Sequence, residues 1–346
     1  MRFKQLASLL LLTVVACTAF GDSAPRKTIS EYELLRQIPK ERLRVLIGDT
    51  RPDAQGFIGT NHRAGQWIEA GTQRGSCRVV IYGVVTGDLA VADDAWRGIE
   101  VTFAHQRADG GFEANDRPNG TSAKPLGAAV ETAFFFLQEL GRAVLVIRQS
   151  PHEKHFHDRL VALEPKMRKA MAFVNSGYDT IITNSTHAVN RIVIAAKAFG
   201  LCGLALHDDQ LVATSRKLIA HALTRRDKDG IFIENGGRDS SYNAVSILFG
   251  QTLALHLPIP EFEAALPKAV AWQITRIREN GEVDVTSNTR TGVGKEPSYF
   301  GEPKIVNYGE VVQALTMFGL VNNDKAALAA ADRAFAFWRA NVSAPK

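Results

Sequence analysis

The stretch Arg226-Asp-Lys-Asp-Gly-Ile-Phe232 recurs in related form at two other places in the chain and reveals its repeating unit. The related stretches are Gln106-Arg-Ala-Asp-Gly-Gly-Phe112 and Arg278-Glu-Asn-Gly-Glu-Val283, and each follows an amphipathic helical pattern. In all three, Asp-Gly or Asn-Gly stands before an apolar residue, and these dipeptides favour tight turns with positive φ. The chain therefore repeats a unit of helix, short link, helix, turn and short extended piece.

Apolar residues recur at helical spacing through most of the chain, whereas long alternating strand patterns are nearly absent. Repeated units of roughly 50–60 residues predict helical hairpins stacked around an axis. We therefore expect an all-α protein, an (α/α) toroid built as an incomplete barrel of about five to seven hairpins. An open α-solenoid is the alternative, but the long loops between the pairs favour the ring. The predicted helices cover 73–87, 92–106, 123–148, 153–174, 186–203, 208–227, 240–256, 261–277, 305–320 and 324–341, with further helix in 31–46 and 61–70.

The composition is that of a globular protein with a mild basic excess. The 346 residues are 45% hydrophobic and 22% charged, with a formal net charge of +5, which favours acidic partners. The chain contains neither GxGxxG nor GxxxxGK[ST]. We expect no cofactor, no nucleic-acid partner and no transmembrane segment, and we leave the oligomeric state open. Three cysteines exclude a disulfide scaffold.

The first 21 residues have the pattern of a secretory signal peptide. Arg2 and Lys4 precede an apolar run over 9–16, which small residues follow. Cleavage after 19–21 would release a soluble protein, and we favour this route. Val14-Val15-Ala16-Cys17 resembles a lipoprotein box, which would leave Cys17 lipidated. We therefore expect an exported protein, periplasmic or secreted, whose residues 22–346 form a single toroid domain.

Chemically rich loops gather on one side of the predicted ring. In a toroid, the loops that run from each outer helix to the next inner helix meet at the end where the inner helices begin. Helix N-termini carry partial positive charge and free N–H groups, so this rim suits an anion. The polar stretches expected there are 113–117, 183–191, 235–242 and 288–308.

Two clusters on this rim are the candidates for chemistry. Asn184, His187 and Arg191 are spaced by three and four residues, which would place them on one face of a helix start. Arg238 and Tyr242 follow Gly236-Gly237; arginine is the natural clamp for a carboxylate. Each cluster also has a structural interpretation, since Asn184 and Asp239 are good helix caps and Tyr242 is a possible core aromatic.

Two further groups of residues are weaker candidates. His152-Glu-Lys-His155-Phe-His157-Asp158 lacks the HExxH spacing of a zinc site, so we expect a solvated helix start and no metal. Asp227, Asp229 and Glu234 offer the paired carboxylates of a glycoside hydrolase, but two of them belong to the turn signature.

At the two rim clusters the chain resembles the (α/α) toroid polysaccharide lyases that cleave uronate polymers such as alginate and glucuronan. The resemblance implies that Asn184, His187, Arg238 and Tyr242 converge on one uronate, with Tyr299 and Tyr308 as rival tyrosines. Ser185 and Thr186 separate Asn184 from His187, whereas the better-known alginate lyases of this fold have Asn and His adjacent. The implied partner is an acidic polysaccharide. Expected substrate-binding residues are Arg191, Asp239, Ser241, Asn288, Arg290, Tyr299 and Tyr308.

The implied reaction is β-elimination, which cuts a 1,4-linked uronate without water or a metal. Arg238 and Asn184 would neutralise the carboxylate, so that the C5 proton becomes acidic enough to remove. In glucuronate or mannuronate the proton and the leaving oxygen share one face, so Tyr242 would act as base and acid. In guluronate they lie on opposite faces, which would make His187 the base.

Two other functions stay open at this point. A glycoside hydrolase on the same toroid would act on uronate-containing or unsaturated oligosaccharides and would need paired carboxylates, such as Glu113 or Asp116 with Asp239. A non-catalytic glycan-binding protein would offer more aromatic platforms than the 4 Trp and 6 Tyr of this chain.

Overall fold

The computed structural model describes residues 29–116, 126–298 and 300–342, and this part of the chain is built of helices with no strand. The leader predicted over 1–21, with Cys17, lies outside the described residues. The elements are α1 (Glu31–Leu35), α2 (Lys40–Leu43), the π-helix η1 (Arg44–Gly48), α3 (Gly59–Ala64), the 3-10 helix η2 (Ala70–Gln73), α4 (Arg74–Thr86), α5 (Leu89–Ala104), α6 (Leu126–Gln149), α7 (Glu153–Ser176), α8 (Tyr178–Asn184), α9 (Val189–Leu206), α10 (Asp209–Leu223), α11 (Ser240–His256), α12 (Pro260–Thr275), α13 (Tyr308–Asn322) and α14 (Lys325–Asn341).

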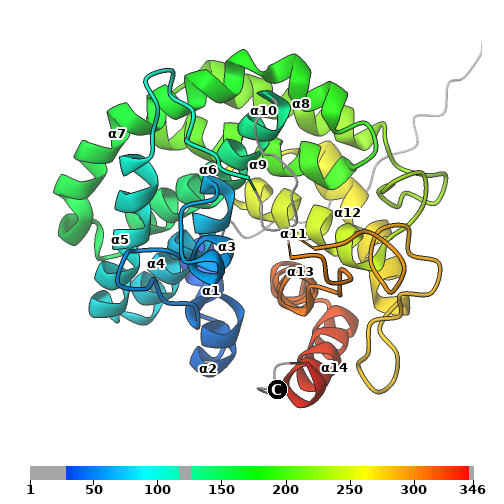
Figure 1. Ribbon diagram of the computed structural model, residues 1–346. Coiled ribbons are helices and arrows are strands. Elements are labelled where there is room, and N and C mark those ends of the chain that lie inside the picture. Colours follow the sequence, from blue (N-terminus) through cyan, green and yellow to red (C-terminus); the bar gives the residue numbers. More distant parts are fainter. Residues whose placement is uncertain (1–28, 117–125, 299, 343–346) are drawn as a thin grey trace, which may run out of the picture.

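Among the described residues, five helical hairpins form an incomplete ring, as the sequence predicts (Figure 1). The inner helices α4, α6, α9, α11 and α13 contact one another in that order, and each packs against its outer partner, α5, α7, α10, α12 or α14. The ring stays open between its first and last hairpins. There η1 contacts both α4 and α13, and α1 packs against α6, α11 and α13.

Three hairpins use the same inner-to-outer connection, which the sequence analysis overlooked. Gly83, Gly203 and Gly319 each stand five residues before an aspartate, and a Cβ on any of them would lie within 3.1 Å of that aspartate's carbonyl oxygen. The inner helix then ends in a left-handed residue, and the aspartate caps the outer helix through its side chain. Glycine therefore lets the two helices of a hairpin approach closely at the turn. The capping residues are Asp88, Asp208 and Asp324.

The three Asp-Gly or Asn-Gly stretches form the opposite connections, from outer helix to inner helix. Each closes on an isolated antiparallel bridge, Gln106 with Phe112, Arg226 with Phe232 and Ile277 with Val283. Their glycines have φ between 87° and 94°, a conformation that glycine adopts at little cost. The predicted repeat is thus confirmed in backbone geometry.

Helix α9 is apolar enough by length and composition to cross a membrane, but it is a core helix of the ring. Its mean hydropathy is 1.6, and 89% of the segment is buried. An inner helix contacts both ring neighbours and its outer partner, so it is apolar on nearly all sides. Burial inside the protein accounts for this composition.

The structure moves the start of α9 away from the predicted position. The pattern predicts one helix over 186–203, but α8 ends at Asn184 and α9 begins only at Val189. Between them, Ala188 pairs with Glu234 in an isolated bridge. Asn184, His187 and Arg191, expected on one helix face, therefore lie at the end of α8, in the turn and in α9.

Candidate active site

A cavity of about 810 Å³ opens at the rim where the five inner helices begin. It is lined from the N-terminal halves of α4, α6, α9, α11 and α13, from α3 and from the loop over 290–305. Five cationic side chains and three carboxylates line it: Arg74, Arg78, Arg191, Arg290 and Lys304 against Glu131, Glu296 and Glu310. The positive excess adds to the partial charge of the helix N-termini, so the cavity suits an anionic ligand.

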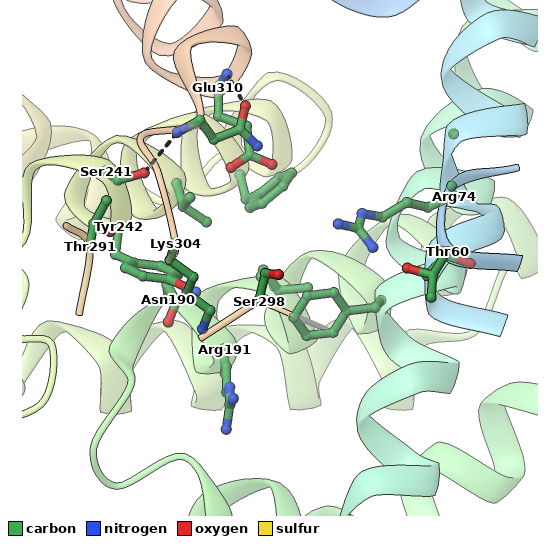
Figure 2. Close-up of a pocket in the computed structure, with 18 of the residues that line it drawn as sticks. Thr60, Arg74, Asn190, Arg191, Ser241, Tyr242, Thr291, Ser298, Lys304 and Glu310 are labelled. Atoms are coloured by element: carbon green, nitrogen blue, oxygen red, sulfur yellow. Dashed lines mark hydrogen bonds between the residues drawn. The ribbon is translucent and has the colours of Figure 1, made fainter. Parts of the chain in front are cut away.

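Tyr242, on the first turn of α11, lines this cavity beside Lys304 (Figure 2). The guanidinium carbon of Arg290 lies 3.9 Å from the centroid of the Tyr242 ring, and the ammonium nitrogen of Lys304 lies 5.7 Å from it. Within the described part of the chain, the Tyr242 hydroxyl forms no hydrogen bond. A tyrosine oxygen in these surroundings is available to a ligand and lies beside positive charges.

Arg290 is held rigidly beside Tyr242 by two carboxylates. Its Nε donates to Glu296 at 3.0 Å, and its Nη1 donates to Glu234 at 2.7 Å. Burial opposes the charge of Arg290, but the hydrogen bonds and the charges of Glu296, Tyr242 and Glu234 outweigh it and raise the pKa of Arg290 further above its usual range. Arg290 therefore carries a permanent positive charge, although its side chain is only 2% exposed.

Asn190, in the first turn of α9, presents an amide beside Tyr242. Its Oδ1 accepts from Arg290 Nη1 at 3.3 Å, which turns the Nδ2 group the other way. That Nδ2 has no hydrogen-bond partner in the part of the chain that the structure describes, and Asn190 lines the cavity. The backbone N–H of Asn190 donates to Glu234 Oε1 at 2.7 Å, which fixes the start of α9. An oriented amide donor thus adjoins the tyrosine.

Glu234 connects Asn190 with Arg290 from outside the cavity lining. It is fully buried and accepts from both Asn190 and Arg290. Burial raises the pKa of Glu234 to about 7, against the lowering effects of Arg290 and the Asn190 N–H. Since Glu234 does not line the cavity, its role here is to position its two partners.

Asp239 fixes the Arg290 loop onto the start of α11. One oxygen of its buried carboxylate caps the helix by accepting from the N–H groups of Ser241 and Tyr242. The other accepts from the N–H groups of Arg290 and Thr291, at 2.9 and 2.8 Å. One carboxylate therefore sets the positions of Tyr242 and Arg290 relative to each other.

Further cations stand around this centre. Lys304 donates to Glu296 at 2.7 Å, and Arg191 lies 3.5 Å from Glu131. Arg74, at the start of α4, extends into the cavity from the side opposite Tyr242 and Asn190 (Figure 2). An acidic chain that entered the cavity would meet positive charge on both sides.

Asn184 and His187 lie outside the cavity lining. Asn184 is exposed at the end of α8, and His187 is exposed in the turn that follows. Burial, with Arg191 and Arg290 next in effect, lowers the pKa of His187. His187 is thus close enough for the charges of Arg191 and Arg290 to act on it, and its neutral form is favoured. Within the described residues, Asn184 has no contact that connects it with the centre.

Arg238 does not line the cavity, which corrects its predicted place there. Its Nε donates to Asp227 at 2.5 Å, and its Nη2 donates to Asp229. Both aspartates belong to the Asp-Gly turn that the sequence singles out, so Arg238 closes that turn and is not available as a substrate clamp. The arginine beside Tyr242 is Arg290, which the sequence analysis placed only among the substrate-binding residues.

The other predicted binding residues divide into two groups. Arg191, Ser241 and Arg290 line the cavity. Asn288 is buried and bonded to Ser240, and the Tyr308 hydroxyl accepts from the Val283 N–H at 3.0 Å, so both hold the loop and not a ligand. Asp239 is likewise a scaffold residue. Tyr299 lies outside the described residues.

Sequence reasoning missed Asn190, Lys304 and Arg74 as site residues. The pair Asn190-Arg191 lies in a polar stretch expected at the rim. Because the pattern predicts a helix start at 186, it favours Asn184 as the rim amide. Lys304 and Arg74 carry no local motif, and only the ring brings α4 and the 290–305 loop to one cavity.

The described residues contain no group of three or more His, Cys, Asp or Glu side chains that would hold a metal. In the 152–158 stretch, His155 pairs with Asp93 on the outer surface. The carboxylates considered for a hydrolase are also engaged. Glu113 contacts His105 at 2.6 Å, Asp227 and Asp229 bind Arg238, and Asp239 is a buried cap.

No family model and no curated protein matches the chain. Among solved structures, the chain is similar to the Streptomyces coelicolor A3 chondroitin AC lyase, which was determined in complex with chondroitin sulphate. The two are 14% identical with a TM-score of 0.49, over 85% of this chain and 39% of that chain. This chain therefore spans well under half the length of that protein.

Proposed function

We propose that this protein is a polysaccharide lyase that cleaves a 1,4-linked uronate polymer, glucuronan or mannuronate-rich alginate, by β-elimination. The observation that carries the proposal is Tyr242, whose hydroxyl has no partner among the described residues. It stands beside Arg290 and Lys304 in a cavity with excess positive charge. A tyrosine so placed fits proton removal from a substrate that brings its own negative charge.

The reaction starts with the substrate carboxylate. The Nδ2 group of Asn190 donates to it, and Arg191 or Lys304 supplies positive charge, so that the carboxylate can accept the electron pair released at C5. Ionised Tyr242 takes the C5 proton, the electrons form the C4–C5 double bond, and the C4–O bond breaks. The leaving oxygen takes the proton from Tyr242, which returns to its ionised form.

The geometry favours the same-face elimination of glucuronate and mannuronate. Tyr242 lines the cavity, whereas His187 lies outside the lining, so one group serves as base and acid. His187, whose lowered pKa favours the neutral form, would serve guluronate only if a bound chain reached the edge of the cavity.

A hydrolase is less well supported. It needs one protonated and one ionised carboxyl group on either side of the scissile bond. The three lining carboxylates face cations: Glu296 faces Arg290 and Lys304, Glu310 lies 3.6 Å from Arg78, and Glu131 lies near Arg191. Burial would raise the pKa of Glu296, but Arg290 and Lys304 lower it to about 2, so Glu296 lacks the proton that a hydrolase must donate.

Export fits this proposal. Acidic polysaccharides of cell surfaces and extracellular matrices lie outside the cytoplasm, and residues 1–21 have the pattern of a leader. We therefore propose a periplasmic or secreted enzyme.

The test is to incubate the mature protein with glucuronan, polymannuronate, polyguluronate and glycosaminoglycans, and to follow the ultraviolet absorbance of the new double bond. We expect absorbance to rise with glucuronan or polymannuronate. New reducing ends without absorbance would show hydrolysis and overturn the proposal, and so would binding without any product.

A further inference from the structure

A strap of chain, defined here as residues 296–298 and 300–304, lies over the cavity. Its two sides pair through an isolated bridge between Pro297 and Pro303, and the Ser298 N–H donates to the Glu302 carbonyl at 2.7 Å. At the base, Lys304 donates to Glu296, which also binds Arg290. The strap is therefore fixed to the same groups that hold the candidate catalytic centre.

The tip of the strap is joined to α3, in the N-terminal part of the ring. Arg63 Nη2 donates to Glu302 Oε1 at 2.5 Å, and the Arg63 guanidinium carbon lies 3.7 Å from the centroid of the Phe300 ring. Hydrogen bonds from Ser298 and Arg63 lower the pKa of Glu302 to about 2, so the pair is ionised at any ordinary pH. The Arg63–Glu302 pair joins residues 239 positions apart in the sequence.

The position of the strap has a consequence for the path of a bound chain. Thr60 of α3 and Ser298 of the strap both line the cavity, and Ser298 lies between the Tyr242 side and the Thr60 side (Figure 2). The strap thus extends across the cavity to α3. A polymer cleaved at an internal linkage must leave the site in two directions, so a segment that crosses the cavity bears on which substrates fit.

We propose that the joining of Arg63 to Glu302 and Phe300 makes the cavity blind on one side, so that the enzyme removes sugars from chain ends and accepts short oligouronates in preference to internal linkages. This inference rests on the proposed function and names its substrate class.

The contact between Arg63 and the strap can open and close, because its ion pair is exposed to solvent. The Arg63 and Glu302 side chains are 57% and 50% exposed, and exposed ion pairs are weakened by salt. The Arg63–Phe300 contact is less sensitive to salt because it also buries apolar surface. Loss of both contacts should open the cavity without disturbing the buried core.

The experiment compares Arg63→Ala and Glu302→Gln with the parent protein on a long polymer that it cleaves. Arg339→Ala is the matched control, because this arginine is exposed on α14, away from the cavity. Two quantities are followed together: absorbance of the double bond and viscosity of the solution. Viscosity falls early when internal linkages are cut and late when sugars leave from ends. Product sizes are read by chromatography.

We expect the parent and the Arg339→Ala variant to release small products with little early loss of viscosity. Arg63→Ala should increase the loss of viscosity per double bond by roughly threefold to tenfold, the range for loss of one exposed ion pair and one cation–π contact. Glu302→Gln should act in the same direction with a smaller effect.

Three results would speak against the inference, and they are distinguishable. Early loss of viscosity with the parent protein would overturn the blind cavity while leaving the lyase in place. An unchanged product pattern in both strap variants would show that the Arg63 contact does not set it. Absence of a double bond from every uronate, long or short, would overturn the proposed function itself and this inference with it.

Discussion

At the scale of single residues, the centre depends on two groups without a hydrogen-bond partner among the described residues, the Tyr242 hydroxyl and the Nδ2 group of Asn190. Their neighbours Arg290, Glu234 and Glu296 bind one another and have fixed places. A site in which the supporting groups are fully bonded while two groups face the cavity is prepared for a ligand. Predictions at this scale therefore concern the two groups and leave their supports intact.

Tyr242→Phe should abolish most turnover while the polymer still binds. The substitution keeps the ring against Arg290 and removes only the oxygen that takes and returns the proton, a loss of about 10³-fold in the range for general acid–base groups. Stability should change little, because the hydroxyl forms no bond with the described residues. Initial rates of double-bond formation and equilibrium binding of the polymer measure the two effects. Retention of most activity would move the base to another residue.

Asn190→Ala should reduce the turnover number by about 10²-fold, the magnitude for losing one oriented donor at a developing negative charge. Asn184→Ala is its matched control, since Asn184 is exposed and outside the cavity lining. We expect the control to retain the parent rate. Equal losses in the two variants, measured as kcat on the same polymer, would contradict the assignment of the amide to Asn190.

At the scale of elements, the connection between α11 and the Arg290 loop determines the geometry of the site. Asp239 accepts from two N–H groups of the helix and two of the loop, and three of these four hydrogen bonds are buried. Neither element places Tyr242 against Arg290 by itself. The sequence analysis recognised Asp239 as a possible cap but placed it also among the binding residues; the structure shows a scaffold role.

Asp239→Ala should destabilise the protein by about 2–4 kcal/mol, because the helix loses its cap and the loop N–H groups lose their acceptor. Chemical denaturation measures this loss. At a temperature where the variant remains folded, its activity should also fall, since Tyr242 and Arg290 lose their shared support. A variant with parent stability and low activity would instead indicate that Asp239 acts on the substrate.

At the scale of the whole molecule, a buried network of charged side chains joins α1 to the ring. Glu31 of α1 accepts from Arg142 of α6 at 2.7 Å and contacts His256 of α11 at the same distance. Glu139 of α6 pairs with Arg142 and with the buried Lys197 of α9. Helix α1 thus packs against the inner helices at the open side of the described ring. Buried charges destabilise the fold unless each keeps its partner, so the network depends on all of its members.

Stability should therefore fall in acid. Burial would raise the pKa of Glu31, but Arg142 and His256 lower it from 4.5 to about 2. A carboxyl group whose folded pKa is depressed contributes stability that is present above pH 4.5 and is lost as the pH falls through 2. The most that Glu31 contributes in this way is about 3 kcal/mol. Denaturation at pH 6 and at pH 3 measures the difference.

Glu31→Gln should reduce stability at pH 6 and flatten the change between pH 6 and pH 3. Glu33→Gln is the matched control, because Glu33 lies on the same helix with its side chain 58% exposed. We expect the control to follow the parent at both pH values. A parent-like pH dependence in Glu31→Gln would show that the acid sensitivity arises elsewhere.

The helices, their pairing and the end of the ring where the cavity opens follow from sequence patterns alone. Helical periodicity and Asp-Gly turns are local properties, and local physics decides them. Tyr242 was also within reach, because it follows a recognisable cap at Asp239. Which arginine and which amide accompany it depends on how the chain packs in three dimensions. Arg238 and Arg290 look alike in sequence. The turn aspartates bind Arg238, whereas buried Glu234 binds Arg290, which is 56 residues away in the sequence, and holds it beside Tyr242. Contacts between distant segments depend on the closed path of the chain, and no local pattern encodes them.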